Sequence, residues 1–252
     1  MPAIAITSLP TTISAPGVYV LTANHNFTAS GAAITVAAND VVLDLNGFTL
    51  SAPQGSQANG IMDSQTASVS GLTVRNGIIT GFKNGVWIED PKSSSCGCQF
   101  EGLLVYNVSY CGIYVCGRGQ VVRRNHIVGV TGAPVGAPDG IFVAGQANAI
   151  LDNDVVDVHG SPGLDPGNAI HINVSTHTVI ENNRISAAAL EAGSAGIRVE
   201  NTSDALVLHN RIFNRGFGIL FVGTGAAGRY GDNVTLACQT PFSGGTDIGN
   251  NH

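Results

Sequence analysis

The chain has 252 residues, of which 11% are charged, and its formal net charge is −6. An acidic chain whose few cations are scattered lacks the basic face that nucleic-acid binding requires, and no run of about 18 apolar residues is present that could span a membrane. The 33 glycines and the scarcity of long helix-forming side chains favour a tightly turned β-protein over a helical one.

The first 32 residues predict a cap. Apolar stretches at 6–10 and 17–21 alternate with turn residues before any regular repeat begins, and an open end of a β-stack has to be covered. We expect a single domain over 1–252, with an N-terminal cap at 1–32, coils at 33–238 and a frayed C-terminal tail at 239–252.

A short phrase recurs every 22 to 29 residues from residue 60 onward: a small residue, then Ile or Val, a variable residue and an apolar one. A period of this size with β-rich units predicts a stacked array of coils. Because side chains alternate along a strand, the Ile or Val of each phrase should point inward, and the glycine before it suits a bend. The predicted inward column is Ile61, Val86, Ile113, Ile141, Ile170, Ile197 and Ile219.

A second phrase places an asparagine after an apolar stretch in most coils. Asparagine tolerates left-handed backbone and bonds to its own chain in turns. We therefore predict a ladder of side-chain amides along one corner of the stack. Its rungs would be Asn76, Asn107, Asn125, Asn153, either Asn182 or Asn183, Asn210 and Asn233.

These phrases resemble the right-handed parallel β-helix proteins of the pectate-lyase-like superfamily, specifically the secreted bacterial members. Residues 42–50 resemble their entry coil, and residues 230–233 and 240–245 resemble their closing coil. The resemblance implies an all-β, single-stranded right-handed solenoid of about eight coils, secreted or at the cell surface, although no signal peptide is visible. This fold carries lyases, hydrolases, epimerases, phage tailspikes and non-enzymes, so it does not select an activity.

The outward column next to the inward one is the most informative feature. Coils stack about 4.8 Å apart, which predicts the neighbours Met62, Trp87, Tyr114, Phe142, His171, Arg198 and Leu220. Aromatic faces stack on sugars, so Trp87, Tyr114, Phe142 and the nearby Asn173 are predicted to bind a polysaccharide. The alternative is that loops at 129–139, 157–168 and 186–195 fold over the aromatic side chains and bury them.

Two kinds of chemistry fit the charged end of this column. In a polyuronate lyase or epimerase, His171 or Tyr114 would be the base and Arg198 the carboxylate clamp beside Glu200; the alternative is a surface Arg–Glu ladder with a solvated histidine. A glycoside hydrolase would use two carboxylates, here Asp139 and Asp165 with Glu200 nearby, although both aspartates also read as turn residues.

Departures from the family's known active sites matter. Uronate epimerases of this fold carry an Asp-Pro-His-Glu run, whereas here Asp165-Pro166 continues with Gly167-Asn168. The paired-aspartate and Gly-His-Gly signatures of polygalacturonases are also missing. No catalytic assignment therefore follows from the resemblance.

Metal and thiol chemistry have weaker signals. Asp152, Asp154 and Asp157 could hold Ca²⁺ through their carboxylates, with salt bridges to neighbouring arginines as the alternative; no other cofactor is expected. A metal site built from Cys96, Cys98, Cys111 and Cys116 would need other spacings. A local disulfide from Cys96 or Cys98 to Cys111 is favoured over such a metal site, buried free thiols are the default expectation, and the pairing of the five cysteines, Cys238 included, stays open.

The sequence thus predicts extracellular polysaccharide recognition, with lyase- or epimerase-type processing of an acidic glycan as the chemistry. The alternative is a non-catalytic structural or adhesive module that forms a homo-oligomer through the aromatic column, since exposed apolar patches mark interfaces.

Overall fold

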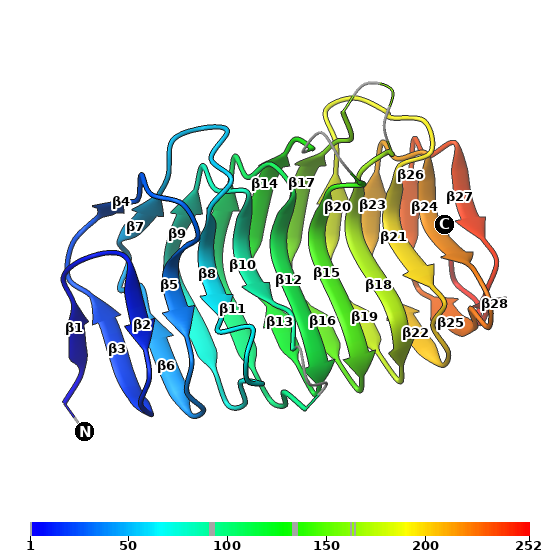
Figure 1. Ribbon diagram of the computed structural model, residues 1–252. Helices are drawn as coiled ribbons and strands as arrows, with labels where there is room; N and C mark the ends of the chain where they lie inside the picture. The colour runs from blue at the N-terminus through cyan, green and yellow to red at the C-terminus, as the bar shows by residue number, and fades with distance from the viewer. Residues whose placement is uncertain (1, 91–93, 133–135, 162, 164) are drawn as a thin grey trace.

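A computed structural model describes residues 2–90, 94–132, 136–161, 163 and 165–252. The chain winds through successive coils from the N-terminus at one end of an elongated stack to the C-terminus at the other (Figure 1). Its regular elements are β-strands that pair in parallel with the equivalent strands of the next coil. Over this part of the chain, no helix is long and apolar enough to cross a membrane.

One face of the stack is a ten-stranded sheet with one strand from each coil. We call it the ten-stranded sheet. Its strands follow one another in chain order, as the front row of arrows in Figure 1 shows. They are β2 (Thr11–Ile13), β5 (Ala32–Val36), β8 (Asn59–Asp63), β10 (Asn84–Ile88), β12 (Cys111–Arg118), β15 (Asp139–Gln146), β18 (Asn168–Thr176), β21 (Ala195–Glu200), β24 (Phe217–Val222) and β27 (Thr240–Ser243).

The remaining 18 strands form two further rows that the long strands β9 (Thr73–Thr80) and β11 (Gln99–Tyr106) join into one bent sheet. The first row also holds β1 (Ile4–Ile6), β3 (Gly17–Leu21), β6 (Val41–Asp44), β13 (Val121–Arg123), β16 (Ala149–Leu151), β19 (Val179–Glu181), β22 (Ala205–Leu208), β25 (Gly228–Gly231) and β28 (Thr246–Asp247). The second row also holds β4 (His25–Asn26), β7 (Thr49–Ser51), β14 (His126–Val130), β17 (Asp154–Val158), β20 (Arg184–Ser186), β23 (Arg211–Phe213) and β26 (Val234–Leu236).

The predicted all-β solenoid of about eight coils is confirmed. The ten-stranded sheet is longer than that because β2 and β27 come from segments that the sequence assigned to the cap and the tail. Residues 239–252 continue the stack rather than fray: β27 pairs with β24, β28 pairs with β25, and the Asn251 side chain accepts hydrogen bonds from Asn233.

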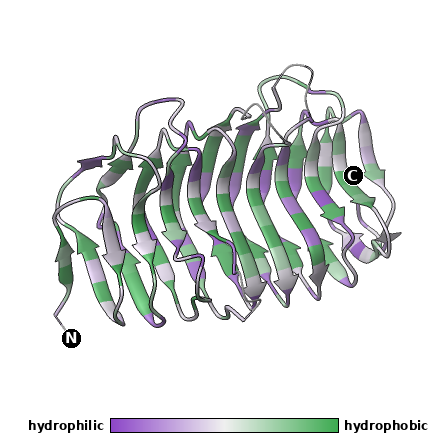
Figure 2. Cartoon of the chain, viewed as in Figure 1, coloured by the Kyte–Doolittle hydropathy of each residue, from purple (hydrophilic) through white to green (hydrophobic). Residues whose placement is uncertain are grey.

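The core lies between the sheets and consists mainly of aliphatic side chains. Every member of the predicted inward column, from Ile61 to Ile219, is fully buried, and the strand register places each beside its equivalent in the next coil. Figure 2 shows the matching alternation of hydrophobic and hydrophilic bands along the strands. Alternation with a period of two, repeated in register, therefore builds the core.

Replacing Ile141 by alanine is expected to lower the free energy of unfolding by about 2–5 kcal/mol. Ile141 is fully buried between Ile113 and Ile170 of the flanking coils, so both neighbours would border the cavity. Equilibrium denaturation measures the loss, and a value below about 1 kcal/mol would contradict the packing described here.

The glycine of each phrase was predicted to allow a bend, but the structure gives another reason for it. At Gly85 and Gly112 the backbone is not left-handed; instead, an added Cβ would lie 2.6 and 2.5 Å from the carbonyl oxygen of the equivalent residue in the next coil. Successive coils approach too closely here for a side chain. Glycine in the repeat therefore reports the tight stacking of coils.

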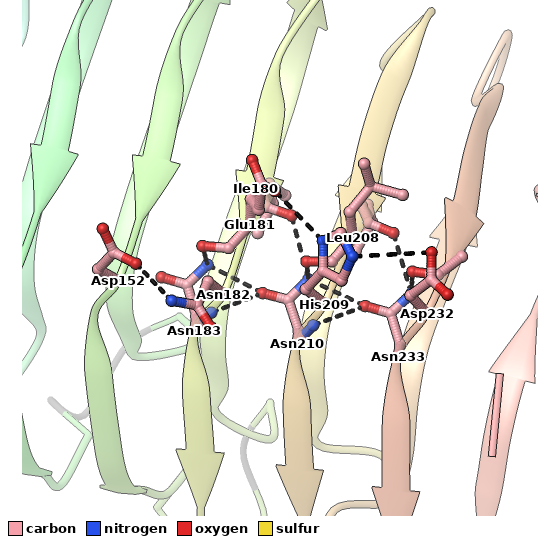
Figure 3. A network of polar contacts seen from close by, with 12 residues as sticks. Asp152, Ile180, Glu181, Asn182, Asn183, Leu208, His209, Asn210, Asp232 and Asn233 are labelled. Atoms are coloured by element: carbon pink, nitrogen blue, oxygen red, sulfur yellow. Dashed lines mark hydrogen bonds and ion pairs between the residues drawn. The ribbon is translucent and has the colours of Figure 1, made fainter. Parts of the chain in front are cut away.

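The predicted amide ladder is present at the corner between the two rows of the bent sheet. The Oδ1 atom of Asn153 accepts from both the backbone N and the Nδ2 of Asn125, at 3.1 and 3.0 Å, and the Nδ2 of Asn153 donates to the Oδ1 of Asn183 at 3.0 Å. Figure 3 shows the later rungs, Asn183, Asn210 and Asn233, in line. These amides are buried, and each also donates to a backbone carbonyl of the preceding coil.

Two predicted rungs are wrong, and one ambiguity is resolved. Asn76 and Asn107 are exposed residues with left-handed backbone outside the ladder, and Asn183 rather than Asn182 is the rung. Left-handed backbone belongs to the residue before each rung, such as Asp152 before Asn153. The rung itself points inward, where its amide has no competing water.

Three loops leave the stack on the edge between the second row and the ten-stranded sheet, as predicted, although residues 133–135, 162 and 164 lie outside the described residues. The loops contact one another: Ser161 donates to the carbonyl of Gly132, and Glu191 accepts from the backbone N of Gly160 and of Gly167. They form a wall along one side of the ten-stranded sheet (Figure 1).

The cysteines follow the default expectation of free thiols, and no disulfide joins Cys96 or Cys98 to Cys111. All five cysteines are free thiols; Cys98 and Cys111 are buried, and Cys96 is exposed. Burial raises the pKa of Cys98 and of Cys116 to about 11, so both thiols stay protonated at neutral pH. Cys98 and Cys111 therefore serve as small buried side chains.

Candidate functional site

The predicted outward column exists on the ten-stranded sheet. Strand register places Met62 beside Trp87, Trp87 beside Tyr114, Tyr114 beside Phe142, Phe142 beside His171, and His171 beside Arg198. The side chains of Trp87, Tyr114 and Phe142 are half-buried, and Tyr110, just before β12, packs against Trp87. The loops thus border this column rather than bury it.

The aromatic rings stack on one another instead of lying flat on the sheet. The ring centroids of Trp87 and Tyr114 are 3.8 Å apart and those of Tyr114 and Phe142 are 4.5 Å apart, with interplanar angles of 14° and 4°. His171 meets Phe142 edge-on at 5.0 Å. Faces that cover each other are not free for a sugar, so a ligand along the column would meet ring edges.

A chain of polar contacts begins where the aromatic rings end. The Nδ1 atom of His171 lies 3.3 Å from a carboxylate oxygen of Asp139, and its Nε2 lies 3.0 Å from Glu200. Arg198 donates to the same Glu200 oxygen at 2.9 Å. We call Asp139, His171, Arg198 and Glu200 the carboxylate–histidine cluster; it spans three successive strands, β15, β18 and β21.

Burial differs across this cluster. The side chains of Asp139 and His171 are each 11% exposed, whereas those of Glu200 and Arg198 are 24% and 28% exposed. Asp139 is therefore a buried strand residue, and its prediction as a turn residue was wrong. The cluster presents its Arg198–Glu200 end to solvent and holds Asp139 beneath.

The cluster can hold and move a proton. A neutral imidazole has one N–H, and only the imidazolium form donates to both Asp139 and Glu200. The Arg198 guanidinium hydrogen-bonded to Glu200 holds the pKa of that carboxyl below its usual range. A histidine between a buried and a half-exposed carboxylate is suited to general acid–base chemistry.

Tyr114 is a poorer candidate base than His171. Burial raises the pKa of the Tyr114 phenol well above its usual value, so this side chain keeps its proton at neutral pH. Its ring is also two coils from His171, with Phe142 between them.

Of the other predicted site residues, Asp165 lies apart from the cluster and Asn173 borders it. Asp165 is exposed in the loop before β18. Asn173 is half-buried beside Glu200 in the strand register, and its amide oxygen accepts from Asn201 at 3.3 Å. The structure thus brings Asp139 to His171 and leaves Asp165 outside.

Sequence reasoning missed Asn168, which positions the buried carboxylate. Its Nδ2 donates to Asp139 Oδ1 at 2.9 Å, leaving the other oxygen of Asp139 for His171. Asn168 and Asp139 belong to a second column, at the start of the strands, that also holds Asn59, Asn84 and Cys111. The sequence signal for this column is the polar residue or cysteine that stands directly before the small residue of the repeated phrase in these coils.

Sequence reasoning also missed Arg215, which holds the backbone next to the site. This side chain is fully buried, and its guanidinium donates to the carbonyls of Val158, Gly167 and Ala195 at 2.9, 3.1 and 3.1 Å. Burial lowers its pKa to about 10, which leaves it charged at neutral pH. Arg215 thereby fixes the backbone just before Asn168 and at the start of β21.

Acidification is expected to weaken the Arg198–Glu200 pair. Because the pKa of Glu200 is lowered in the folded state, the stabilisation is present above the unfolded value of about 4.3 and is lost as pH falls through the folded value. For a half-exposed pair it amounts to at most about 1 kcal/mol.

The measurement for this pair is chemical denaturation of the wild type and Glu200→Gln at several pH values. The stability difference between them should be constant near neutral pH and shrink in acid. A difference that grows on acidification would contradict the assigned pair.

The second outer face carries ion pairs. His126 and Arg184 both contact Asp154, Asp152 accepts from Asn182 at 2.6 Å, and Asp157 accepts from the backbone N of Ala188. Within the described ranges, no group of three or more His, Cys, Asp or Glu side chains is arranged to hold a metal ion. Calcium binding at these aspartates stays a hypothesis that no observation here supports.

Comparisons with known proteins agree with this architecture. A family model for the right-handed β-helix region matches residues 59–237, which confirms the predicted hand of the solenoid. A comparison with curated proteins gives no match.

Two solved structures share the fold. One is the enzymatically active domain of tailspike protein 2 from bacteriophage CBA120, with a TM-score of 0.65 and 13% identity over 98% of this chain. This chain spans 41% of that tailspike chain. The other is an alginate lyase from Paenibacillus sp. str. FPU-7, with a TM-score of 0.56 and 13% identity over 91% of this chain and 92% of the lyase. At this identity the likeness concerns the fold.

Proposed function

The chain belongs to the right-handed β-helix family, and we propose that it binds an acidic polysaccharide across the ten-stranded sheet and moves the proton next to a sugar carboxylate. The carboxylate–histidine cluster is the observation that carries this proposal. It joins a buried, oriented histidine to a half-exposed arginine on one open face. A base and a cation side by side are what proton abstraction next to a carboxylate requires.

Glu200 occupies the position that a substrate carboxylate would take. Its Oε2 atom accepts from Arg198 and lies within hydrogen-bonding distance of His171. A uronate carboxylate would compete for the Arg198 guanidinium, whose fork binds carboxylates in a bidentate way. Once Glu200 is displaced, the Nε2 atom of His171 faces the sugar.

Epimerisation and elimination would then share the same first step. Neutral His171 takes the C5 proton on Nε2, and the electron pair of the C–H bond moves toward the carboxylate, whose charge Arg198 neutralises. In an epimerase a proton returns to C5 from the other face of the ring. In a lyase the electron pair forms the C4–C5 double bond, the C4–O4 bond breaks, and the leaving O4 takes a proton from the His171 imidazolium or from solvent. Asp139 supports the imidazolium that forms.

The choice of test ligand follows the structural likeness to an alginate lyase, although fold alone does not fix an activity. Polyuronates carry the carboxylate that the cluster would bind, and an extracellular location forms part of this proposal. Alginate and pectate are the first polymers to test, with a neutral glucan as the comparison.

The experiment is incubation of the wild-type protein with alginate or pectate in deuterated water, followed by proton NMR. We expect loss of the C5 proton signal through exchange, or new signals of an unsaturated uronate. If neither polymer shows exchange, epimerisation or elimination, the proposed chemistry is wrong.

One observation favours a second candidate, a non-catalytic module that self-associates. Val234 and Leu236 on β26 and Ile248 just after β28 are 38%, 63% and 53% exposed, and exposed apolar groups at a sheet edge promote association. We assign the self-association to this surface and not to the aromatic column, because the aromatic rings stack on one another. Light scattering that gives a stable oligomer unaffected by polyuronates would favour this candidate.

A further inference from the structure

Next to the aromatic column, at the carboxyl ends of β10, β12 and β15, lies a cavity of about 650 Å³. Glu89, Cys96, Cys116, Arg118, Gln146 and Val174 are among the residues that line it. Its volume is within the range of ligand-binding pockets, and the carboxylate–histidine cluster does not include any of these side chains. We propose that this cavity is a second sugar subsite, which takes a hexuronate unit of the same polysaccharide chain; this inference rests on the proposed function.

The cavity and the cluster share a row of side chains. Strand register places Cys116 beside Ala144, Ala144 beside Asn173, and Asn173 beside Glu200. Three steps between coils correspond to roughly 14 Å. An oligosaccharide can therefore reach from the cluster to the cavity. The small side chain of Ala144 leaves space for it on the surface between them.

The aromatic column turns polar edges toward this row. The indole Nε1 of Trp87 lies 3.4 Å from Glu89, and Tyr114 lies two residues before Cys116 on the same strand, β12. Because the ring faces cover each other, these edges are what a sugar would contact. The ligand path thus lies beside the aromatic rings rather than on top of them.

The polar groups of the cavity suit a hexuronate. Arg118 is exposed and forms no ion pair with any acidic side chain among the described residues, so its guanidinium is available for a sugar carboxylate. Glu89 and Gln146 are exposed acceptors for sugar hydroxyl groups. Asp90 also lines the cavity, but its buried carboxylate accepts from the Ser68 hydroxyl and from the backbone N of Ser94 and Ser95. Arg118 is the cation of this lining, which distinguishes the site from a purely apolar pocket.

Val174 supplies the apolar contact at a conformational cost. It is 70% exposed, and its φ of 47° is in the left-handed region, which is rare for a β-branched residue. The strand register shifts here, with Gly145 opposite Ser175, so Val174 is an inserted bulge residue. Bulges next to active sites redirect side chains, and strained residues cluster at ligand contacts.

The first arm of the test uses Cys96 as a reporter. It is the exposed cysteine of the cavity, so an alkylating reagent should modify it first, with Cys96→Ser as the control for assignment. We expect saturating alginate oligosaccharides to slow this modification at least fivefold and neutral oligosaccharides to leave it unchanged.

The second arm compares affinities of variants by calorimetry. Arg118→Ala should weaken polyuronate binding about tenfold, whereas Arg229→Ala, an exposed arginine on β25, should leave it unchanged. Val174→Gly should weaken binding while the protein becomes no less stable, because glycine relieves the left-handed backbone. A purely structural role for Val174 would not separate affinity from stability in this way.

The outcomes separate the two proposals. If the wild type binds polyuronates but Cys96 is not protected and Arg118→Ala binds unchanged, the second subsite is wrong and the proposed function stands. If the wild type binds neither alginate nor pectate, the proposed function fails, and the subsite fails with it.

Discussion

Replacing Asn153 by leucine is expected to lower the free energy of unfolding by about 3–6 kcal/mol. Leucine has nearly the same shape, so the change removes hydrogen bonds without opening a cavity. The backbone N of Asn125 and the carbonyl of Val122 would lose their partners inside the stack, and each buried group left unpaired costs about 1–3 kcal/mol. The amide of Asn125 would lose its acceptor as well.

Urea denaturation of Asn153→Leu measures this loss. The matched control is Asn26→Leu, an exposed asparagine on β4, which should change stability by no more than about 0.5 kcal/mol. Equal, small effects of the two substitutions would show that the ladder contributes little, and the account of the corner would be wrong.

His171→Ala is expected to reduce C5 proton exchange or elimination by about 10²- to 10⁴-fold, the usual contribution of a general base. The reason is that the proposed chemistry passes the proton through the Nε2 atom of this side chain. The measurement is the initial rate with alginate or pectate at saturating concentration. Binding of the polymer should weaken much less, because Arg198 remains.

The control is His209→Ala. His209 also lies between two carboxylates of neighbouring coils, with Nδ1 3.2 Å from Glu181 and Nε2 3.7 Å from Asp232, but on the other outer face of the stack. This variant should keep the wild-type rate. Retained activity in His171→Ala, or an equal loss in both variants, would contradict the role of His171.

Much of the fold could be predicted because the repeat constrains it. Once the phrase around Ile141 is set in register with its neighbours, alternation along the strand fixes both the inward column and the outward one. That is why His171 and Arg198 could be placed side by side from sequence and are found in register. The same alternation cannot decide between adjacent asparagines at a corner, and so Asn182 and Asn183 stayed open.

The site itself could be predicted only in part, because it depends on loops and ring orientation. Asp139 precedes a glycine, a common turn pair, and nothing local shows that loops bury it against Asn168. The buried charge of Arg215 depends on carbonyls 20 or more residues away along the chain, such as that of Gly167. The rings of Tyr114 and Phe142 stack on each other because the spacing between coils matches the distance at which aromatic rings stack. This stacking could have been predicted from the column of residues.

Calorimetric titration of the wild type and Arg198→Ala with alginate, pectate and a neutral glucan tests the central claim most directly. Arg75→Ala is the matched control, because Arg75 also donates through Nε to a carboxylate oxygen at 2.9 Å, but outside the site. We expect the wild type and Arg75→Ala to bind a polyuronate in preference to the glucan. Arg198→Ala should lose about ten- to a hundredfold in polyuronate affinity, the worth of one charge-assisted hydrogen bond. Wild-type protein that binds neither polyuronate, or Arg198→Ala that keeps the full preference for acidic polymers, would contradict the account.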